Sequence, residues 1–459
     1  MAYNYYLNYC NNKLNYNGKI IENNSYLICY DSEMNFNTED IDKLVNEKIE
    51  IDGLYSVIIY NKLDNEIRFY QDCYGYIHPL YYYIDKGNIY INLSLKELVK
   101  SYPYKVELNR NKIQEFCIYG FIQENETLIK NIYKLDVCQQ AIFKDGALKL
   151  SYLNYKFNKD KVYNSYLDVI KSNIPDSDNF FSTLSSGFDS NLIAKALHDM
   201  NKTTTTFTIG GKIGKDETPQ AKVISKHYGW KNYSDLVDTS YLNELPNIVN
   251  VLEDSCLEIG IFLQQALINL LKKYYNGEIV LLGDAADQII SENYHTAERK
   301  LTTLTRFKFK DNPYLAAWHI ILRKNGSFLR YNNMKYCYPF INNDMIRFCD
   351  NYRVDNGTGK KHYKDYIRSI VDPEIVDILS KYGGSTSVEA LYESEEQMVN
   401  LGNTIAESTW GHIYHELKLP IRVKIYEVLY LLVFEYIFID NAKTDINSLS
   451  LDEVLKAKK

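Results

Sequence analysis

The sequence of 459 residues predicts two domains, an α+β domain of layered β-sheets followed by an α/β domain built on a doubly wound parallel sheet. Short alternating or aromatic runs, separated by turn residues, fill the first part of the chain. Strands and helices then alternate, which is typical of a parallel sheet covered by helices. Beyond about residue 295 the pattern is mainly helical. We therefore expect domains at residues 1–155 and 156–459.

The first domain is expected to contain short strands and two short helices, at Ser94–Ser101 and Arg110–Tyr119. Pairs such as Asn-Asn, Asp-Gly and Lys-Gly separate the runs, and these residues favour tight turns. The expected strands are Ser25–Tyr30, Leu54–Tyr60, Ile67–Tyr70, Tyr81–Ile84, Ile89–Leu93 and Gln140–Phe143.

The second domain is expected to alternate strand and helix from about Tyr166 onward. Apolar residues within Asp189–Met200 recur at helical spacing, so this segment is predicted to be a helix. Loops that follow parallel strands meet in one crevice, where ligands bind. The other expected elements are the strands Phe180–Leu184, Thr205–Ile209, Tyr233–Val237 and Glu278–Leu282 and the helices Pro219–Tyr228 and Ile261–Tyr275.

Charge and hydropathy exclude several classes of protein. The chain has 52 Lys and Arg against 59 Asp and Glu, a net charge of −7, which argues against general binding to nucleic acid or anionic lipid. The most apolar segment, Val428–Ile439, is interrupted by Glu435 and is predicted to be a buried helix. Residues 1–4 lack the pattern of a secretory signal, so we expect a cytoplasmic protein without membrane insertion. Its eight cysteines, none in a C-x-x-C pair, are expected to be buried, inert thiols.

The strongest chemical signal is the segment Ser185-Ser186-Gly187-Phe188-Asp189-Ser190, which links a predicted strand to a predicted helix. Small residues allow close approach of a ligand, and backbone N–H groups at a helix N-terminus attract anions. The carboxylate of Asp189 would repel phosphate unless a metal ion lies between them. Together these features predict a cradle for pyrophosphate and Mg²⁺. The alternative is an ordinary Ser/Gly turn that caps a helix.

A second loop, Gly283-Asp284-Ala285-Ala286-Asp287, also follows an apolar strand. If the two loops meet in one crevice, Asp189 and Asp287 could share Mg²⁺, which binds a few carboxylates together with phosphate oxygens. The alternative is that an aspartate in this place caps a helix.

These motifs resemble those of asparagine synthetases and of relatives that activate a carboxylate as an acyl-adenylate, including β-lactam synthetases and lasso peptide macrolactam cyclases. The first loop matches S-G-G-x-D-S, with Ser186 in place of the first glycine, and the second matches G-x-(S/A/G)-x-D. Further matches are Lys215-Asp216-Glu217, Pro339-Phe340-Ile341-Asn342, Lys364-x-x-Ile367-Arg368 and Lys381-x-Gly383.

The first domain resembles the family's glutaminase-type domain, which has an Ntn-hydrolase-like fold. The matching segments are Gly53–Val57, Asp72-x-x-Gly75-x-x-x-Pro79-Leu80, Leu93–Leu98, Glu126-Thr127-Leu128 and Ile132-x-x-Leu135. Active members carry a nucleophilic cysteine directly after the initiator methionine, where this sequence has Ala2. Because Cys10 is internal and has no free α-amine as its base, we expect no glutamine hydrolysis.

The resemblance implies ATP and Mg²⁺ as cofactors. It places Mg²⁺ on Asp189 and Asp287, and pyrophosphate on the first loop and Gly283. It also implies that Lys381 stabilises developing negative charge. Asp284 stands where asparagine synthetases have glutamate, and it is expected to orient the amine or accept its proton. The residues expected to contact the nucleotide are Leu184, Ser185, Ser186, Gly187, Asp189, Ser190, Ile209 and Gly283.

The expected activity is ATP-dependent amide ligation, in which a carboxylate is adenylated and then attacked by an amine. Without ammonia from glutamine, the amine is expected on the substrate itself, most simply in a lasso-type precursor peptide that closes a macrolactam. A leader-peptide-binding protein and a protease would then be partners. The alternatives are an asparagine synthetase that uses free ammonia, a β-lactam-synthetase-like cyclase of small molecules, and a non-catalytic scaffold that retains the fold.

Overall fold

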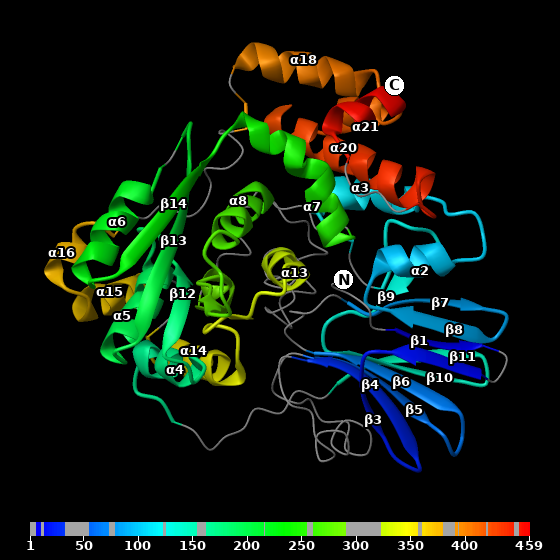
Figure 1. Cartoon of the computed structure of the whole chain (residues 1–459), viewed down its shortest axis with the longest axis horizontal. Coiled ribbons are helices and arrows are strands. Elements are labelled where there is room, and N and C mark those ends of the chain that lie inside the picture. Colours follow the sequence, from blue (N-terminus) through cyan, green and yellow to red (C-terminus); the bar gives the residue numbers. More distant parts are fainter. Residues whose placement is uncertain are drawn as a thin grey trace.

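The protein is described here from a computed structural model, in which the first part of the chain forms two antiparallel sheets and the second a parallel sheet surrounded by helices (Figure 1). This confirms the predicted mixed fold of two different layered parts. The proposed boundary at residues 155 and 156 lies outside the described residues. The structure describes residues 6–10, 13–32, 55–72, 79–122, 125–153, 162–214, 216–254, 260–290, 323–356, 360–379, 391–392, 394–418, 421–444 and 449–459.

The two antiparallel sheets lie face to face, with an apolar core between them. One has the order β2-β1-β8-β7-β9 and the other β11-β10-β6-β5-β4-β3. Helix α2 (Leu95–Ser101) packs on the first sheet. The strands are β1 (Tyr6–Cys10), β2 (Lys13–Asn17), β3 (Lys19–Glu22), β4 (Tyr26–Ser32), β5 (Tyr55–Asn61), β6 (Glu66–Gln71), β7 (Tyr81–Asp85), β8 (Asn88–Asn92), β9 (Tyr133–Lys134), β10 (Gln139–Lys144) and β11 (Ala147–Tyr152).

Two tight hairpins follow from turn residues that the sequence marks. Lys86 and Gly87 join β7 to β8 with φ angles of 48° and 79°. Asp145 and Gly146 join β10 to β11 with φ angles of 51° and 77°. Consecutive positive φ angles match the right-handed twist of the paired strands. The predicted Lys-Gly and Asp-Gly turns are therefore confirmed.

The parallel sheet has the order β14-β13-β12-β15-β16. The chain runs outward from β12 to β14 and then returns to place β15 on the other side of β12, so the loops after these two central strands are neighbours. Helices α5 and α6 cover one face and α8 the other (Figure 1). The elements are β12 (Asn179–Thr183), β13 (Thr203–Gly211), β14 (Lys231–Val237), β15 (Ile279–Leu281), β16 (Tyr336–Cys337), α5 (Phe188–Asp199), α6 (Thr218–His227) and α8 (Ile261–Leu271).

Strand β16 departs from the prediction, because it lies in the region expected to be mainly helical. Its two residues extend the sheet beyond β15, with Val280 opposite Tyr336. A strand of two residues carries no recognisable alternation of polar and apolar side chains. It forms because the neighbouring strand offers unpaired backbone groups.

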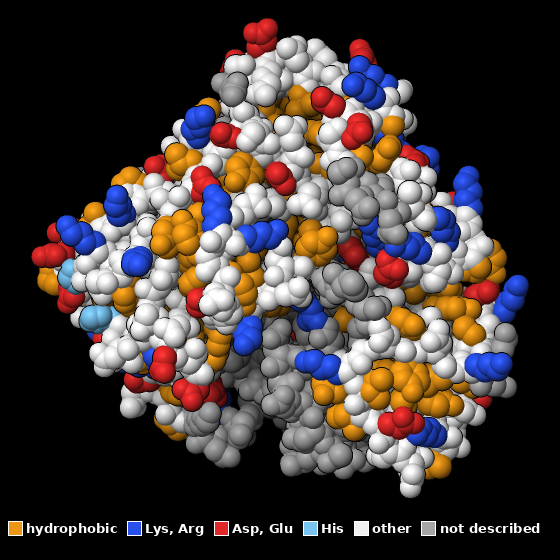
Figure 2. All heavy atoms as spheres, in the orientation of Figure 1, with side chains coloured by type: hydrophobic (Ala, Val, Ile, Leu, Met, Phe, Trp, Pro, Cys, Tyr) orange, Lys and Arg blue, Asp and Glu red, His pale blue; other side chains and the backbone are white. Residues whose placement is uncertain are grey.

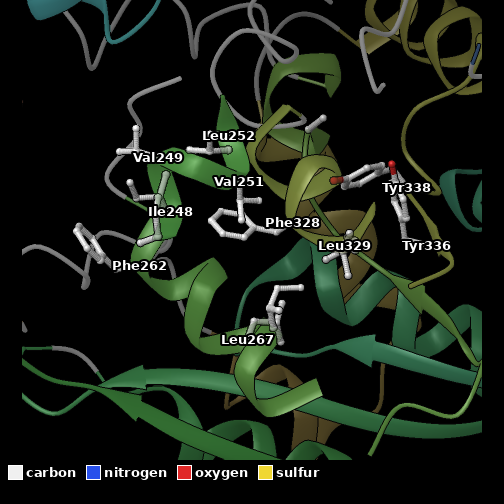
Figure 3. Close-up of a cluster of buried hydrophobic side chains, with 14 of the residues drawn as sticks. Ile248, Val249, Val251, Leu252, Phe262, Leu267, Phe328, Leu329, Tyr336 and Tyr338 are labelled. Carbon is white, nitrogen blue, oxygen red and sulfur yellow. The ribbon is translucent and has the colours of Figure 1, made fainter. Parts of the chain in front are cut away.

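Helices make up the rest of the described structure. Figure 3 shows the core where apolar residues of α7 face α8 and α13. The remaining helices are α3 (Arg110–Tyr119), α4 (Tyr166–Asn173), η2 (Thr239–Glu244), α7 (Leu245–Leu252), α9 (Ala286–Ile290), α13 (Arg323–Tyr331), α14 (Asn343–Asn356), α15 (Lys360–Ile370), α16 (Pro373–Val376), α18 (Glu395–Ala406), α19 (Gly411–Glu416), α20 (Ile421–Glu435), the π-helical segment η4 (Tyr436–Asp440) and α21 (Leu451–Ala457).

The apolar segment Val428–Ile439 lies within α20 and η4, and most of it is buried in the core, as predicted. Among the helices that the structure describes, none is long and apolar enough to cross a lipid bilayer. Figure 2 shows acidic and basic side chains interspersed over the face in view.

The described cysteines differ from the prediction of buried thiols at three positions, because Cys10 and Cys337 are only half-buried and Cys138 is not a thiol. Cys138 is disulfide-bonded, whereas Cys10, Cys29, Cys117, Cys337 and Cys349 are free thiols. The backbone N–H of Cys138 donates to the carbonyl of Asp72 at 2.9 Å, so segments far apart in the sequence meet here. Cysteine spacing along the chain could not reveal this contact.

Buried charged residues connect the two parts of the chain. We call this group, which consists of Lys134, Asp254, Arg323 and the hydroxyl of Tyr81, the interdomain ion cluster. Asp254 Oδ2 lies 3.1 Å from Lys134 Nζ and 2.6 Å from Arg323 Nη2. The side chains of Lys134 and Asp254 are 0% exposed, and that of Arg323 is 1% exposed. Tyr430 of α20 donates to the backbone carbonyl of Asp254 at 2.6 Å. The buried carboxylate of Asp254 thus faces two basic groups and accepts a hydrogen bond from Tyr81 at 3.3 Å, while burial lowers the pKa of Lys134.

Two more contacts cross the same boundary. Glu253 Oε1 accepts from the hydroxyl of Ser94 at 2.9 Å, and burial raises the pKa of Glu253 to about 7. Lys443 reaches the end of α2, where its Nζ donates to the carbonyls of Val99 and Lys100 at 2.8 Å each and of Tyr102 at 2.5 Å. A cation in this place stabilises the carbonyl groups at the C-terminal end of the helix.

We expect the contact between α6 and α16 to depend on pH. His227 Nε2 lies 2.6 Å from Asp372 Oδ2, and Nδ1 lies 3.3 Å from Glu374 Oε2. The hydrogen bond to Asp372 raises the pKa of His227 above 6.5. Protonation therefore favours the folded state, and this contribution is present below pH 6.5 and is lost as pH rises through the higher folded-state pKa.

The check is thermal unfolding of the wild type and of His227→Gln across a pH series. The difference in Tm between the two proteins should be largest near about pH 5.5 and should vanish near about pH 9. Over this range the side chain at position 227 loses a positive charge in the wild type and stays neutral in the variant. A difference that stays constant with pH would show that the contact does not depend on the charge of His227.

Candidate functional site

The loop between β12 and α5 is held by hydrogen bonds from both sides. The N–H of Leu184 donates to the carbonyl of Phe207 at 2.9 Å, and Thr208 Oγ1 donates to the carbonyl of Leu184 at 2.8 Å. These bonds fix the end of β12 against β13, where Ile209 lies half-buried two residues after Phe207. Leu184, directly after β12, and Ile209, near the end of β13, thus lie at the same edge of the sheet.

Inside this loop, Ser190 links the beginning of the loop to the helix. Its Oγ lies 3.1 Å from Ser185 Oγ and accepts from the N–H of Ser185 at 3.2 Å. The N–H of Gly187 donates to Ser185 Oγ at 3.1 Å. Ser186 is buried, with 1% of its surface exposed. The four small residues predicted to form the cradle therefore lie together in one tight turn.

Asn191 of α5 also holds this loop, although sequence reasoning did not single it out. Its Nδ2 donates to the carbonyls of Ser185 at 3.0 Å and Gly187 at 2.7 Å, and the residue is fully buried. By engaging both carbonyls, the amide reduces the negative potential that the loop would present to an anion. The only signal in the sequence is a polar residue on the otherwise apolar inner face of the predicted helix.

Asp189 lies in the first turn of α5, which begins at Phe188 after the N-cap residue Gly187. Its carboxylate faces Lys360, the first residue of α15, whose Nζ lies 3.5 Å from Oδ1 and 3.4 Å from Oδ2. Burial lowers the pKa of Lys360, and the charge of Asp189 acts in the opposite direction. Sequence reasoning did not identify Lys360, which is 171 positions away from Asp189.

Helix α15 continues along the start of α5. Lys364 Nζ and Arg368 Cζ lie 5.6 Å and 5.0 Å from the centroid of the Phe188 ring, which is a cation–π arrangement. Lys360, Lys364 and Arg368 follow one another at intervals of four residues and so share one face of the helix. Three cations therefore line the side of α15 that faces the loop.

The second predicted loop meets the first, as expected from the order of the strands. A Cβ atom on Gly283 would lie 3.3 Å from the backbone N of Ser190, so glycine permits this close approach. Asp284 is half-buried, and its charge, together with burial, raises the pKa of Tyr338 well above the ordinary value. Tyr338 follows β16 as Asp284 follows β15, which brings both to the same edge of the sheet.

Two predicted site residues are not placed. Asp287 lies on α9, but its side chain is outside the described structure, and Lys381 lies outside the described residues altogether. The structure thus brings together Leu184, Ser185, Ser186, Gly187, Asp189, Ser190, Ile209, Gly283 and Asp284.

The donor set fits a phosphate group with a hard metal ion. Serine hydroxyl groups and the start of α5 lie next to Asp189, which supplies one carboxylate, and Gly283 packs against the backbone of Ser190. Among the residues whose side chains are described, no group of three or more His, Cys, Asp or Glu could hold a metal ion without other ligands. A metal ion at Asp189 would therefore depend on oxygens from a bound phosphate, which is how Mg²⁺ usually binds.

Comparisons with known proteins place both parts of the chain. A family model described as asparagine synthase matches residues 176–335, and one described as a glutamine amidotransferase domain matches residues 43–155. A protein of Methanocaldococcus jannaschii, named as an asparagine synthetase of the glutamine-hydrolyzing type, is 26% identical over 238 residues. The match covers 45% of this chain and 46% of that relative, so the chain spans about half of the relative's length. The second part of the chain is therefore similar to asparagine synthases, and the first part is similar to glutamine amidotransferase domains.

Proposed function

We propose that the protein is an ATP-dependent ligase that adenylates a carboxylate, releases pyrophosphate and couples the acyl group to an amine. The observation that carries this proposal is the meeting of two strand-end loops at the start of α5, with Asp189 between hydroxyl groups and a cationic helix face. This arrangement suits a polyphosphate that is held mainly by backbone N–H groups and hydroxyls.

The site residues then take the following roles. Asp189 and Asp287 hold Mg²⁺, which when bound neutralises charge on the phosphates. Leu184 and Ile209 flank the nucleotide at the ends of β12 and β13, and Gly283 lets the second loop pack against the start of α5. The pyrophosphate is held by Ser185, Ser186, Gly187 and Ser190.

Lys381 and Asp284 are the proposed catalytic residues. The ammonium group of Lys381 would stabilise the negative charge that develops as the carboxylate attacks and as the amide forms. Asp284 would orient the amine or accept its proton. Its position at the sheet edge, near enough to Tyr338 to raise the pKa of that hydroxyl, supports a place beside the reacting groups.

For the nitrogen donor we propose an amine on the substrate itself, and for the substrate a precursor peptide that closes a macrolactam. Burial raises the pKa of Cys29 and of Cys117 to about 12, which argues against either thiol as the nucleophile for glutamine hydrolysis. A leader-binding protein and a protease would then be partners. The relative's name supports the alternative, in which aspartate is amidated.

The test is the release of pyrophosphate and AMP with candidate acids. Peptides that carry an internal Asp or Glu and a free N-terminus are compared with aspartate plus ammonium and with short β-amino acids. We expect release with a peptide and a product lighter by one water molecule, and loss of both in Lys381→Ala. Release with aspartate alone would favour the amidation alternative. No release with any acid, or full turnover in Lys381→Ala, would contradict the proposed ligase.

A further inference from the structure

The contact between Lys360 and Asp189 lies at the place where the proposed metal would bind. Lys360 Nζ is nearly equidistant from the two carboxylate oxygens, at 3.5 Å and 3.4 Å. A cation that contacts a carboxylate would take a similar place. The side chains are 20% and 25% exposed, so the pair is only partly screened by solvent. The ammonium group and a metal ion would therefore compete for the same carboxylate.

The position of Lys360 is set by the packing of α15. Tyr363 and Ile367 are fully buried, which anchors the helix in the core. One turn further on, Lys364 lies over the ring of Phe188, the residue before Asp189. Since α15 is fixed to the first turn of α5 in this way, Lys360 can exchange partners by rotating its own flexible side chain.

We propose that Lys360 is the resident counterion of Asp189, and that a metal ion and a polyphosphate enter this site together because the phosphate takes over the ammonium group that the metal displaces. A metal ion alone would leave the ammonium group next to a divalent cation in a partly buried site. A polyphosphate alone would approach a carboxylate that is already neutralised. When the metal ion and the polyphosphate bind together, the carboxylate pairs with the metal and the ammonium group pairs with the phosphate.

This inference rests on the proposed nucleotide site, and it predicts a thermodynamic coupling that needs no turnover. By linkage, if polyphosphate strengthens metal binding, the metal strengthens polyphosphate binding by the same factor. Removing the ammonium group should strengthen the binding of metal alone and weaken the coupling. A lysine that only stabilises the fold would produce neither change.

The experiment measures Mn²⁺ binding by electron paramagnetic resonance, with and without a non-hydrolysable ATP analogue. Lys360→Gln should bind Mn²⁺ alone about tenfold more tightly than the wild type, and the analogue should strengthen that binding about tenfold less. Lys361→Gln is the matched control, since Lys361 is the next residue of α15 and is exposed. It should match the wild type in both measurements.

Two further variants keep the test decisive. Lys360→Arg retains the positive charge and should bind Mn²⁺ alone as weakly as the wild type, even if Lys360→Gln fails to fold. In Asp189→Asn the effect of the analogue on Mn²⁺ should be lost. The proposal is overturned if Lys360→Gln and the wild type bind Mn²⁺ alone with equal affinity, or if Lys360→Arg resembles a folded Lys360→Gln. Coupled binding without pyrophosphate release from any acid would refute the ligase and leave the role of Lys360 standing.

Discussion

Asp189→Asn is expected to reduce substrate-dependent pyrophosphate release by roughly a thousandfold while leaving the protein folded. The substitution keeps the shape of the side chain but removes the charge that faces Lys360 at 3.4 Å and 3.5 Å. A neutral amide is a poor ligand for Mg²⁺, so the phosphates would lose both their metal and the group that orients it. The check is release of pyrophosphate under saturating substrate, together with circular dichroism.

A matched control is Asp178→Asn. Asp178 precedes β12, its side chain is 94% exposed, and it contacts Lys202 at 3.5 Å. This change should leave pyrophosphate release unaltered, because an exposed pair contributes little. The free energy of unfolding of Asp189→Asn should fall by about 1–2 kcal/mol, because Lys360 loses its partner in a partly buried site and the first turn of α5 loses a negative charge. Full activity in Asp189→Asn would remove Asp189 from the proposed metal site.

Asp254→Asn is expected to destabilise the protein by about 3–5 kcal/mol. The substitution leaves the buried side chains of Lys134 and Arg323 without the one carboxylate that both of them contact. Their exposed fractions of 0% and 1% mean that water cannot replace it. The measurement is urea unfolding followed by tryptophan fluorescence, with the free energy of unfolding compared between the variant and the wild type.

The matched control for this prediction is an ion pair on the surface. Asp64 lies 2.8 Å from Lys144, and their side chains are 39% and 42% exposed. Asp64→Asn should change the free energy of unfolding by no more than about 1 kcal/mol. If Asp254→Asn unfolds at the same urea concentration as this control, the interdomain ion cluster does not hold the two parts together. Replacing all three charged members by apolar residues should restore much of the lost stability.

Much of the second part could be predicted because its strands and helices are continuous in sequence. The β12–α5 unit contains a buried strand, a loop of small residues and a periodic helix within one short segment. Helix α5 begins at Phe188, one residue before the predicted start, because Gly187 rather than Phe188 is the N-cap residue. The order of the strands places the loop that contains Gly283 next to the start of α5, as expected for a parallel sheet.

What sequence reasoning missed depends on contacts between distant segments. Lys360 reaches Asp189 because α15 packs across α5, and no local pattern encodes that crossing. Lys134 and Asp254 are 120 positions apart, and each alone would be expected at the surface. Strand β5 is buried on both sides, because Ile58 faces the core between the sheets and Val57 and Ile59 belong to a second cluster. Because both faces of β5 are buried, its sequence has no alternation of polar and apolar residues from which an exposed face could be predicted.

The reach of Lys443 across the molecule has a consequence for biosynthesis. Its ammonium group completes the end of α2, yet it lies 341 to 344 residues downstream of the carbonyls it contacts. During translation the first part of the chain emerges and can fold long before this lysine leaves the ribosome. The contacts of Lys443 with α2 can therefore form only after translation has passed residue 443, long after α2 itself has been made. Ribosomes stalled before codon 443 would carry a nascent chain whose α2 end is still open to water.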